Sequence, residues 1–351
     1  MMEAVIEAME RGLVPDSLVR RGIRKLCEDR LGSFRRLSPE SASEQAQRYI
    51  NSLREGPVAI HTDDANRQHY ELPPPFFERV LGKNLKYSSG FWPEGCHELD
   101  ESERIALSET CHRAELADGQ RILELGCGWG SLTLFMARNY PKAKIIAISN
   151  SAPQKKFIEA KARQEGLANV AVLTRNMPDV TSLEKEFPRF DRVVSVEMFE
   201  HMKNYGLLLE RISRWLAPSG KLFVHIFTHK EYSYPFETAG EDNWMGKYFF
   251  TGGQMPAHHL LKNFQDHLTL EREWMWSGTH YAKTSEAWLF NMDRHRREII
   301  KIMADVYGPN HAMRWFRRWR IFFMACAELF GYDQGREWGV SHYLFSNRRG
   351  L

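Results

Sequence analysis

The sequence predicts an α/β fold in which helices cover both faces of an open, mostly parallel sheet. Two observations support this prediction. Between residues 121 and 227, short apolar runs alternate with stretches whose apolar residues recur at helical spacing. The first run ends in a glycine-rich loop that leads into a helix, which is typical of folds that bind a ligand beyond the carboxyl ends of their strands.

Apolar runs locate the strands and apolar spacing locates the helices. The expected strands are 121–125, 145–148, 170–173, 192–196, 222–227 and a closing strand at 338–345. Helices are expected between them where apolar residues share a face, as Leu132 does with Phe135 and Met136, and Leu208 with Ile212 and Trp215. Pro153 suits the first turn of the helix after the second strand, and two more helices are expected near 285–305 and 311–330.

The same patterns divide the chain into four segments. Residues 1–60 have charged amphipathic helices, which favour a helical cap on the core, although a basic amphipathic helix also suits a membrane surface. Residues 61–227 form the core and begin with a Pro-rich segment that extends to residue 118. Residues 228–285 break the alternation and are rich in aromatic residues and glycine, which is typical of a lid over a binding site. Residues 286–351 supply further helices and the closing strand.

Composition narrows the class of protein. The 351 residues are 43% hydrophobic, enough for a sizeable core, and the formal charge of +3 does not indicate a nucleic-acid partner. Five cysteines without a CxxC pair predict a reduced, cytoplasmic protein, and no HExxH-like spacing indicates a metal site. Because no uncharged apolar stretch of about 18 residues occurs, we expect no stable membrane insertion. The sequence leaves a homodimer open.

The glycine loop determines which cofactor is expected. A dinucleotide needs a third glycine at position 131 and an acid near the end of the second strand, where this chain has Ser131 and Ser149. Glu124, two residues before the first glycine, suits an ammonium group. S-adenosylmethionine (SAM) carries an ammonium and a sulfonium but no phosphate, so the loop predicts SAM. The alternative is a simple packing junction between strand and helix.

A second polar group follows the strand at 192–196. Glu197, Glu200 and His201 stand at its carboxyl end, where ligands bind in this fold class. An ammonium nitrogen must lose a proton before it can attack a methyl group. A neutral histidine accepts that proton, and a carboxylate orients the imidazole or holds the amine. We therefore predict that these three residues are catalytic. The alternative is a glutamate that caps a helix with the histidine packed against it.

Several stretches together resemble a known family. They are residues 69–73, residues 85–89, LELGCGWGSL from Leu123, VEMFEHMKNYG from Val196, YFFTGGQMP from Tyr248 and AELFGY from Ala327. They resemble the coclaurine-type N-methyltransferases of benzylisoquinoline alkaloid synthesis and, more distantly, the cyclopropane fatty acid synthases. The resemblance implies a class I methyltransferase, Rossmann-like fold with a seven-stranded sheet, a helical N-terminal cap and an inserted substrate lid.

The resemblance also implies roles for individual residues. Glu197, Glu200 and His201 match the catalytic or substrate-orienting group of the N-methyltransferase branch. The residues implied at the cofactor are Tyr87, Ser88, Gly126, Gly128, Asn150 and Gln154, with Asn176 and Met177 against the adenine edge.

The lipid-modifying branch of the family uses a bound bicarbonate as base. Glu200, His225 and Tyr281 match its ligands, but Ser89 stands where that branch has a cysteine, which weakens the case for bicarbonate. The residues implied as aromatic walls of the substrate site are Phe227, Trp244, Trp276 and Tyr281, with ordinary lid packing as the alternative. His225 and Glu94 are further candidates for the substrate pocket, with a surface loop as the alternative for Glu94.

Three functions remain after this reasoning. The best supported is a SAM-dependent N-methyltransferase that acts on a small aromatic or cyclic amine and releases S-adenosylhomocysteine. The second is a lipid-modifying transferase, for which the basic and aromatic stretch 314–323 suits a membrane interface, although its spacing fits a buried helix face better. A non-catalytic binding protein is the weakest, because both the glycine loop and the Glu–His group are present.

Overall fold

The computed structural model describes residues 2–60, 72–238, 240 and 243–348. Residues 61–71, which open the predicted core segment and include the start of the 69–73 stretch, lie outside these ranges.

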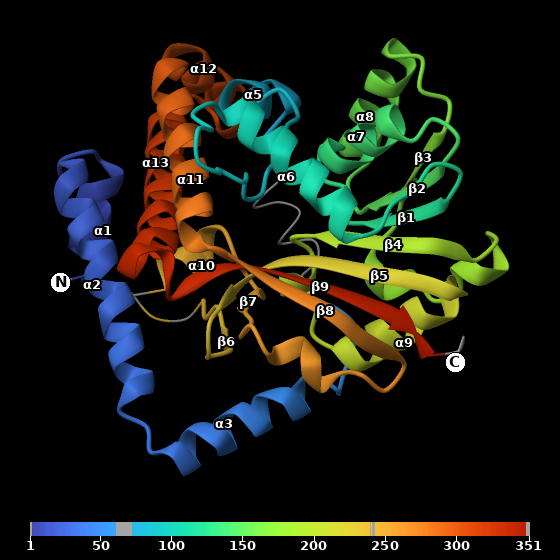
Figure 1. Ribbon diagram of the computed structural model, residues 1–351. Helices are drawn as coiled ribbons and strands as arrows, with labels where there is room; N and C mark the ends of the chain where they lie inside the picture. The colour runs from blue at the N-terminus through green and yellow to red at the C-terminus, as the bar shows by residue number, and fades with distance from the viewer. Residues whose placement is uncertain (1, 61–71, 239, 241–242, 349–351) are drawn as a thin grey trace.

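Seven strands form one sheet across the middle of the molecule (Figure 1). The strand order is β3-β2-β1-β4-β5-β9-β8, and among these seven strands β9 alone runs opposite to the other six. The predicted seven-stranded, mostly parallel sheet is therefore confirmed. Its strands are β1 (Arg121–Leu125), β2 (Lys144–Ser149), β3 (Val170–Thr174), β4 (Phe190–Val196), β5 (Leu216–His229), β8 (Leu268–Ser277) and β9 (Trp338–Asn347).

Helices cover both faces of this sheet (Figure 1). On β1, Ile122 packs with Leu132 on one face and Leu123 packs with Leu208 on the other, because successive strand residues point to opposite faces. The helices are α1 (Met2–Glu10), α2 (Asp16–Arg35), α3 (Pro39–Ser52), α5 (Pro74–Val80), α6 (Leu99–Arg113), α7 (Ser131–Asn139), α8 (Ala152–Gln164), α9 (Tyr205–Trp215), α10 (Trp244–Tyr248), α11 (Gly278–Arg294), α12 (Arg296–Tyr307) and α13 (Pro309–Gly331).

The structure differs from the predicted lid at 228–285. Its first part is irregular and contains a small ribbon of β6 (Tyr234–Pro235) and β7 (Gln254–Met255). Its last part is not lid, since β8 is the edge strand of the main sheet and α11 begins at Gly278. The sequence shows no apolar pattern for β8, because an edge strand is largely exposed. Only Leu268 and Trp276 of its ten residues are buried.

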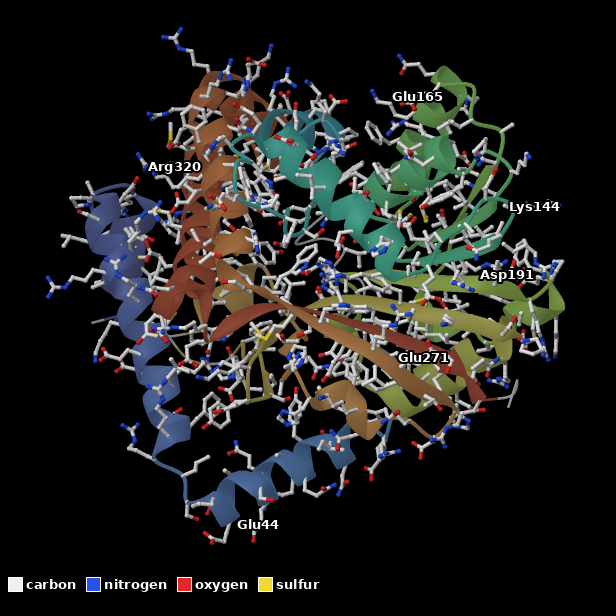
Figure 2. The ribbon with its side chains drawn as sticks, in the orientation of Figure 1. Glu44, Lys144, Glu165, Asp191, Glu271 and Arg320 are labelled. Carbon is white, nitrogen blue, oxygen red and sulfur yellow. The ribbon has the colours of Figure 1, made fainter. Side chains whose placement is uncertain are left out.

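The helical layer also differs in detail from the sequence prediction. Two helices were expected near 285–305 and 311–330, but the structure has three, because the first region is divided into α11 and α12 at His295. No proline or glycine in the sequence marks this break. The first two helices of the N-terminal segment pack against α13 through ion pairs. Arg320, labelled in Figure 2, pairs with Asp16 and Asp293 at 2.7 Å each. Within the described residues, no helix is long and apolar enough to span a membrane.

Candidate active site

The loop after β1 needs glycine at two positions. Gly126 and Gly130 have φ angles of 80° and 83°, a region that side chains other than glycine rarely adopt. A Cβ at Gly126 would lie 2.9 Å from Met198 Cγ, and one at Gly130 would lie 2.6 Å from Ile158 Cγ1. Between them, a Cβ at Gly128 would meet nothing within 4 Å, so the loop presents bare backbone there, at the carboxyl edge of the sheet, where a ligand can approach closely.

A buried carboxylate lies beside this loop. Glu124 is 2% exposed, and its Oε2 accepts a hydrogen bond of 2.5 Å from Thr133 Oγ1. Burial raises the pKa of Glu124 to about 7, although the Thr133 bond opposes the shift. A cationic ligand would restore the ionised form of this carboxylate, so the site fits an ammonium group.

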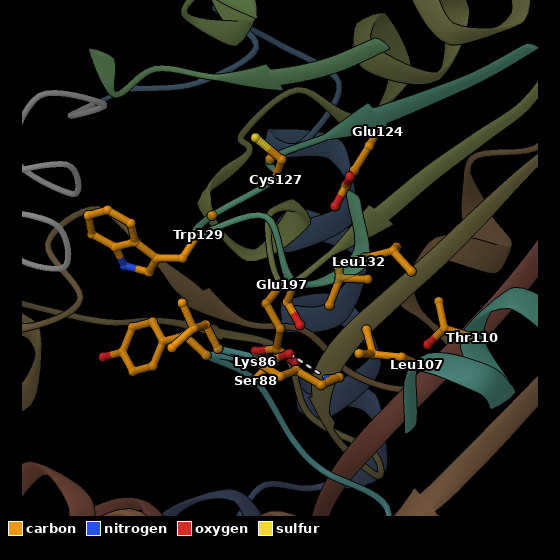
Figure 3. Close-up of a pocket in the computed structure, with 15 residues that line it drawn as sticks. Lys86, Ser88, Leu107, Thr110, Glu124, Cys127, Trp129, Leu132 and Glu197 are labelled. Atoms are coloured by element: carbon orange, nitrogen blue, oxygen red, sulfur yellow. Dashed lines mark hydrogen bonds between the residues drawn. The ribbon is translucent and has the colours of Figure 1, made fainter. Parts of the chain in front are cut away.

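The glycine loop and Glu124 line a cavity that we call the loop cavity (Figure 3). Its empty space is about 550 Å³ including the part open to solvent. Lys86 enters from the segment before α6, and its Nζ donates to Ser88 Oγ at 2.6 Å. The residues predicted at the cofactor that line this cavity are Tyr87, Ser88, Glu124, Gly126 and Gly128.

The other predicted cofactor residues stand at neighbouring strand ends but are not among those lining the loop cavity. Gln154, in the first turn of α8, is buried and accepts a 2.7 Å hydrogen bond from Ser149 Oγ. Its Nε2 has no hydrogen-bond partner among the residues described, so it is available to a ligand. Asn150 follows β2, and Asn176 and Met177 follow β3. Their contact with a cofactor stays a prediction.

The predicted catalytic group is placed by a strained turn after β4. Glu197 has a φ of 51°, which is unusual for a residue with a side chain. A short 3₁₀ helix follows at Phe199–His201 and carries Glu200 and His201. Leu85, which lies just before the Lys86–Ser88 stretch, has a similar φ of 52°. Such strain collects at functional sites, and here both strained residues line the loop cavity.

Glu197, Glu200 and His201 line a second cavity, which we call the aromatic cavity. Its empty space is about 710 Å³ including the part open to solvent, and aromatic and other apolar side chains form most of its wall. Tyr87 and Glu197 line both cavities, so the two meet at these residues. Lining residues that the sequence did not assign are Phe236, Met245, Phe250, Met255, Trp288, Phe322, Cys326, Leu329 and Phe330.

Burial dominates the electrostatics of the aromatic cavity. It lowers the pKa of His201 to about 4, so at pH 7 the imidazole is in its neutral form, the form that can accept a proton. Burial raises the pKa of Glu197, although nearby Lys86 and the Tyr281 hydroxyl oppose the shift. Burial and the adjacent Glu197 raise the pKa of Glu200 well above its usual range. An ammonium ligand would counter both carboxyl shifts.

The residues present do not fit a bicarbonate. Two of its candidate ligands already face Glu197, since Tyr281 donates from its hydroxyl to Oε2 at 3.4 Å and His225 Nε2 lies 3.1 Å from Oε1. Ser89 is fully buried, and its hydroxyl donates to the carbonyl of Gly90 at 2.9 Å. The carboxylate of Glu197 therefore stands where these groups would hold an anion.

Four residues predicted at the substrate lie outside the wall of the aromatic cavity. Glu94 is exposed in a loop. Trp244 turns away, because its Nε1 donates to Glu10 at 3.0 Å while the next residue, Met245, lines the cavity. Trp276 packs edge-on against His225, and both stand behind Glu197. Phe227 and Tyr281 do line the cavity, and their contact with a substrate stays a prediction.

These features define a SAM-dependent methyltransferase of class I. They are a parallel sheet with one reversed strand, a glycine loop with a buried carboxylate beside it, and an adjoining cavity with a neutral histidine. A family model described as mycolic acid cyclopropane synthetase matches residues 59–336. (S)-coclaurine N-methyltransferase from Papaver somniferum is 37% identical over 349 residues, which cover 99% of this chain and 98% of the relative. The enzyme of the same name from Thalictrum flavum subsp. glaucum is 36% identical over 353 residues, covering 98% and 95%.

The structural comparison agrees with the sequence comparison. A crystal structure of coclaurine N-methyltransferase bound to N-methylheliamine and S-adenosylhomocysteine matches with a TM-score of 0.92 and 34% identity, covering 97% of this chain and 98% of that chain. The chain belongs to the mycolic acid cyclopropane synthetase family and, within it, to the coclaurine-type N-methyltransferases. It is a SAM-dependent N-methyltransferase, as the sequence predicted.

Proposed function

We propose that this enzyme methylates the ring nitrogen of a flat cyclic amine related to the benzylisoquinolines. The observation that carries the proposal is that the loop cavity and the aromatic cavity meet at Tyr87 and Glu197. A methyl donor in the first cavity and an amine in the second would meet there. The names of the relatives and the amine bound in the matching crystal structure support this substrate class. Aromatic walls also suit a flat cation.

In the proposed mechanism, the chain binds the amine as an ammonium and then deprotonates it. Glu197 and Glu200 hold the ammonium, and neutral His201 takes the proton from nitrogen. The freed lone pair then forms the N–C bond. When bound, SAM supplies a methyl group on a sulfonium, whose C–S bond breaks with its electron pair left on sulfur. The cavity walls align the nitrogen for this in-line displacement.

The cofactor residues in this proposal are those of the loop cavity together with the adjoining strand ends. Glu124 would pair with the ammonium of the methionine part, because it is a buried carboxylate beside the bare glycine backbone. Asn150, Gln154, Asn176 and Met177 would meet the ribose and adenine at the ends of β2 and β3.

A labelled-methyl assay tests the substrate class. Purified protein receives methyl-labelled SAM with a tetrahydroisoquinoline, an acyclic primary amine or phospholipid vesicles. Label is expected chiefly in the tetrahydroisoquinoline. Transfer to the vesicles alone would refute the proposal. The variant Glu101→Gln, an exposed position on α6, serves as a control that retains activity.

Two further parts of the proposal concern the whole protein. A cytoplasmic location and a homodimer are both proposals from the sequence. Light scattering behind a sizing column measures the second directly, because the chain mass is 41.0 kDa and a dimer has twice that mass.

A further inference from the structure

A line of polar side chains runs from Glu197 away from both cavities. His225 Nε2 lies 3.1 Å from Glu197 Oε1, and His225 Nδ1 lies 2.8 Å from His342 Nε2. His342 Nδ1 in turn lies 2.9 Å from Nη1 of Arg113, the last residue of α6. The sheet register holds the two rings together, since His225 on β5 is paired with His342 on β9. Neither histidine lines the loop or the aromatic cavity.

The direction of the hydrogen bonds along this line is fixed by chemistry. Burial lowers the pKa of both histidines well below the usual range, and the charge of Arg113 adds to the shift, so both rings are neutral. Each neutral ring carries one N–H, and a guanidinium only donates. Arg113 therefore donates to Nδ1 of His342. The proton of His342 must then be on Nε2, where it bonds to Nδ1 of His225.

These hydrogen bonds also determine which atom of His225 faces the carboxylate of Glu197. With Nδ1 of His225 accepting, the proton of His225 is on Nε2, the atom that faces Glu197. The approach is off the line of a well-formed hydrogen bond, so the contact adds mainly a dipole directed at Oε1. The other groups that act on Glu197 are Lys86, Glu200 and the Tyr281 hydroxyl.

We propose that Arg113 is a positioning residue for the methyl transfer, which acts through His342 and His225 to keep Glu197 an anionic acceptor for the substrate ammonium. The role of Glu197 rests on the function proposed above, whereas the tautomers of the two histidines do not. A purely structural role for Arg113 is the competing explanation. Its guanidinium also pairs with Glu109 at 2.6 Å and stacks over Trp274 at 5.1 Å.

The first test compares two arginine variants of equal burial. The side chain of Arg113 is 12% exposed and that of Arg192 is 14% exposed, so Arg113→Met and Arg192→Met remove similar packing. We expect Arg113→Met to lower kcat about tenfold with unchanged affinity for S-adenosylhomocysteine. The acid limb of the pH profile of kcat/KM should move to higher pH by about half a unit or more, because the ionised carboxylate of Glu197 is less stabilised. Arg192→Met should retain the wild-type pH profile. An unshifted limb in Arg113→Met would overturn the proposal.

A second pair of variants covers the case in which Arg113→Met does not fold. The amide of His342→Gln is able to accept from Arg113 and donate to His225, whereas His342→Leu breaks the line. We expect the glutamine variant to retain several times the kcat of the leucine variant. Equal loss in both would contradict the proposal.

A spectroscopic measurement separates this proposal from the proposed substrate. Nitrogen-15 shifts of the imidazoles, assigned with the His342→Gln variant, should show His225 and His342 as neutral Nε2–H tautomers in the wild-type protein. An Nδ1–H tautomer at either ring would refute the line even if amine methylation is confirmed. Correct tautomers with no amine methylation would instead contradict only the proposed function.

Discussion

The loop cavity and the aromatic cavity share Tyr87 and Glu197, but the chain assembles them in different ways. Most of the loop cavity comes from two short stretches, 85–88 and 124–132, with the second arranged around the glycine loop after β1. The aromatic cavity draws on β5, the segment with α10, and the helices α11 and α13, which are far apart in the sequence.

The two cavities therefore depend on different structural features. A loop of backbone and one buried carboxylate depends mainly on local chain geometry after one strand. A wall of apolar side chains depends on how helices pack over the sheet, and single substitutions in it change the shape of the cavity and so which molecule fits. Binding of the cofactor and turnover of the amine should therefore respond to different substitutions.

The largest expected effect is at His201. The variant His201→Ala should lower kcat by about 10²- to 10⁴-fold, because it removes the proton acceptor of the aromatic cavity. Affinity for S-adenosylhomocysteine, measured by calorimetry, should stay within about twofold of wild type, since His201 does not line the loop cavity. If His201→Ala lost affinity for S-adenosylhomocysteine as strongly as it lost kcat, the two cavities would not be functionally separate. His112→Ala, at an 83% exposed side chain, is the control.

A substitution at Glu124 should have the opposite effect, lowering cofactor affinity more than turnover. The variant Glu124→Ala should weaken binding of S-adenosylhomocysteine by about 10- to 100-fold, the value of a lost charge-assisted hydrogen bond. Turnover at saturating SAM should change much less. Glu124→Gln keeps an acceptor for Thr133 and so isolates the charge. Unaltered affinity in calorimetry would remove Glu124 from the cofactor site.

A smaller effect is expected at the wall of the aromatic cavity. Phe250 lies nearly parallel to the ring of His201, with centroids 6.2 Å apart and an interplanar angle of 11°. The variant Phe250→Leu should raise KM for the amine about three- to tenfold and leave KM for SAM unchanged, because aromatic contacts contribute about 1 kcal/mol. Phe187→Leu, just before β4 and outside the wall of the aromatic cavity, should change neither constant. A change in KM for SAM alone would contradict the division between the cavities.

The smallest effect concerns stability against pH, and its sign should differ between the cavities. The pKa of His201 is lowered to about 4, so the unfolded chain binds more protons below pH 6.5 and stability is lost as the pH falls. The pKa of Glu124 is raised to about 7, so its contribution is present at low pH and is lost as the pH rises from about 4.5 to 7.

Two variants measure these opposite contributions by urea unfolding between pH 5 and 7. His201→Gln should lower the slope of unfolding free energy against pH, and Glu124→Gln should raise it, each by up to about 1.4 kcal/mol per pH unit. Shifts of the same sign in both variants would show that one of the two groups does not titrate as the structure indicates.

The contrast between the cavities also explains how far sequence reasoning reached. The positions of the glycine loop, Glu124 and the group from Glu197 to His201 were predictable, because each lies at the end of a strand or directly after it, where local chain geometry sets its place. Phe250 and Phe330 belong to stretches that carried the family resemblance, yet nothing in their spacing says that they face a cavity. Trp244 was assigned to the substrate site through the family resemblance, and a one-residue difference in helix phase turned Met245 inward instead.

The same limit applies to the fold and to the line behind Glu197. β8 escaped prediction because its exposure removes the apolar pattern that marks a strand. Arg113 and His342 are far apart in the sequence, and only the insertion of β9 beside β5 brings them to the same place. Pairings of this kind depend on tertiary contacts that no local pattern encodes.

The position of β9 in the sheet has a consequence for biosynthesis. β8 reaches the sheet only through β9, and β9 is also the partner that covers the second edge of β5. While a ribosome is still making α11 to α13, a nascent chain therefore exposes two strand edges that are open to pairing with other chains. Aggregation during expression should depend on how quickly residues 338–347 emerge, and a synonymous slow codon placed just before them would lower the yield without altering the finished enzyme.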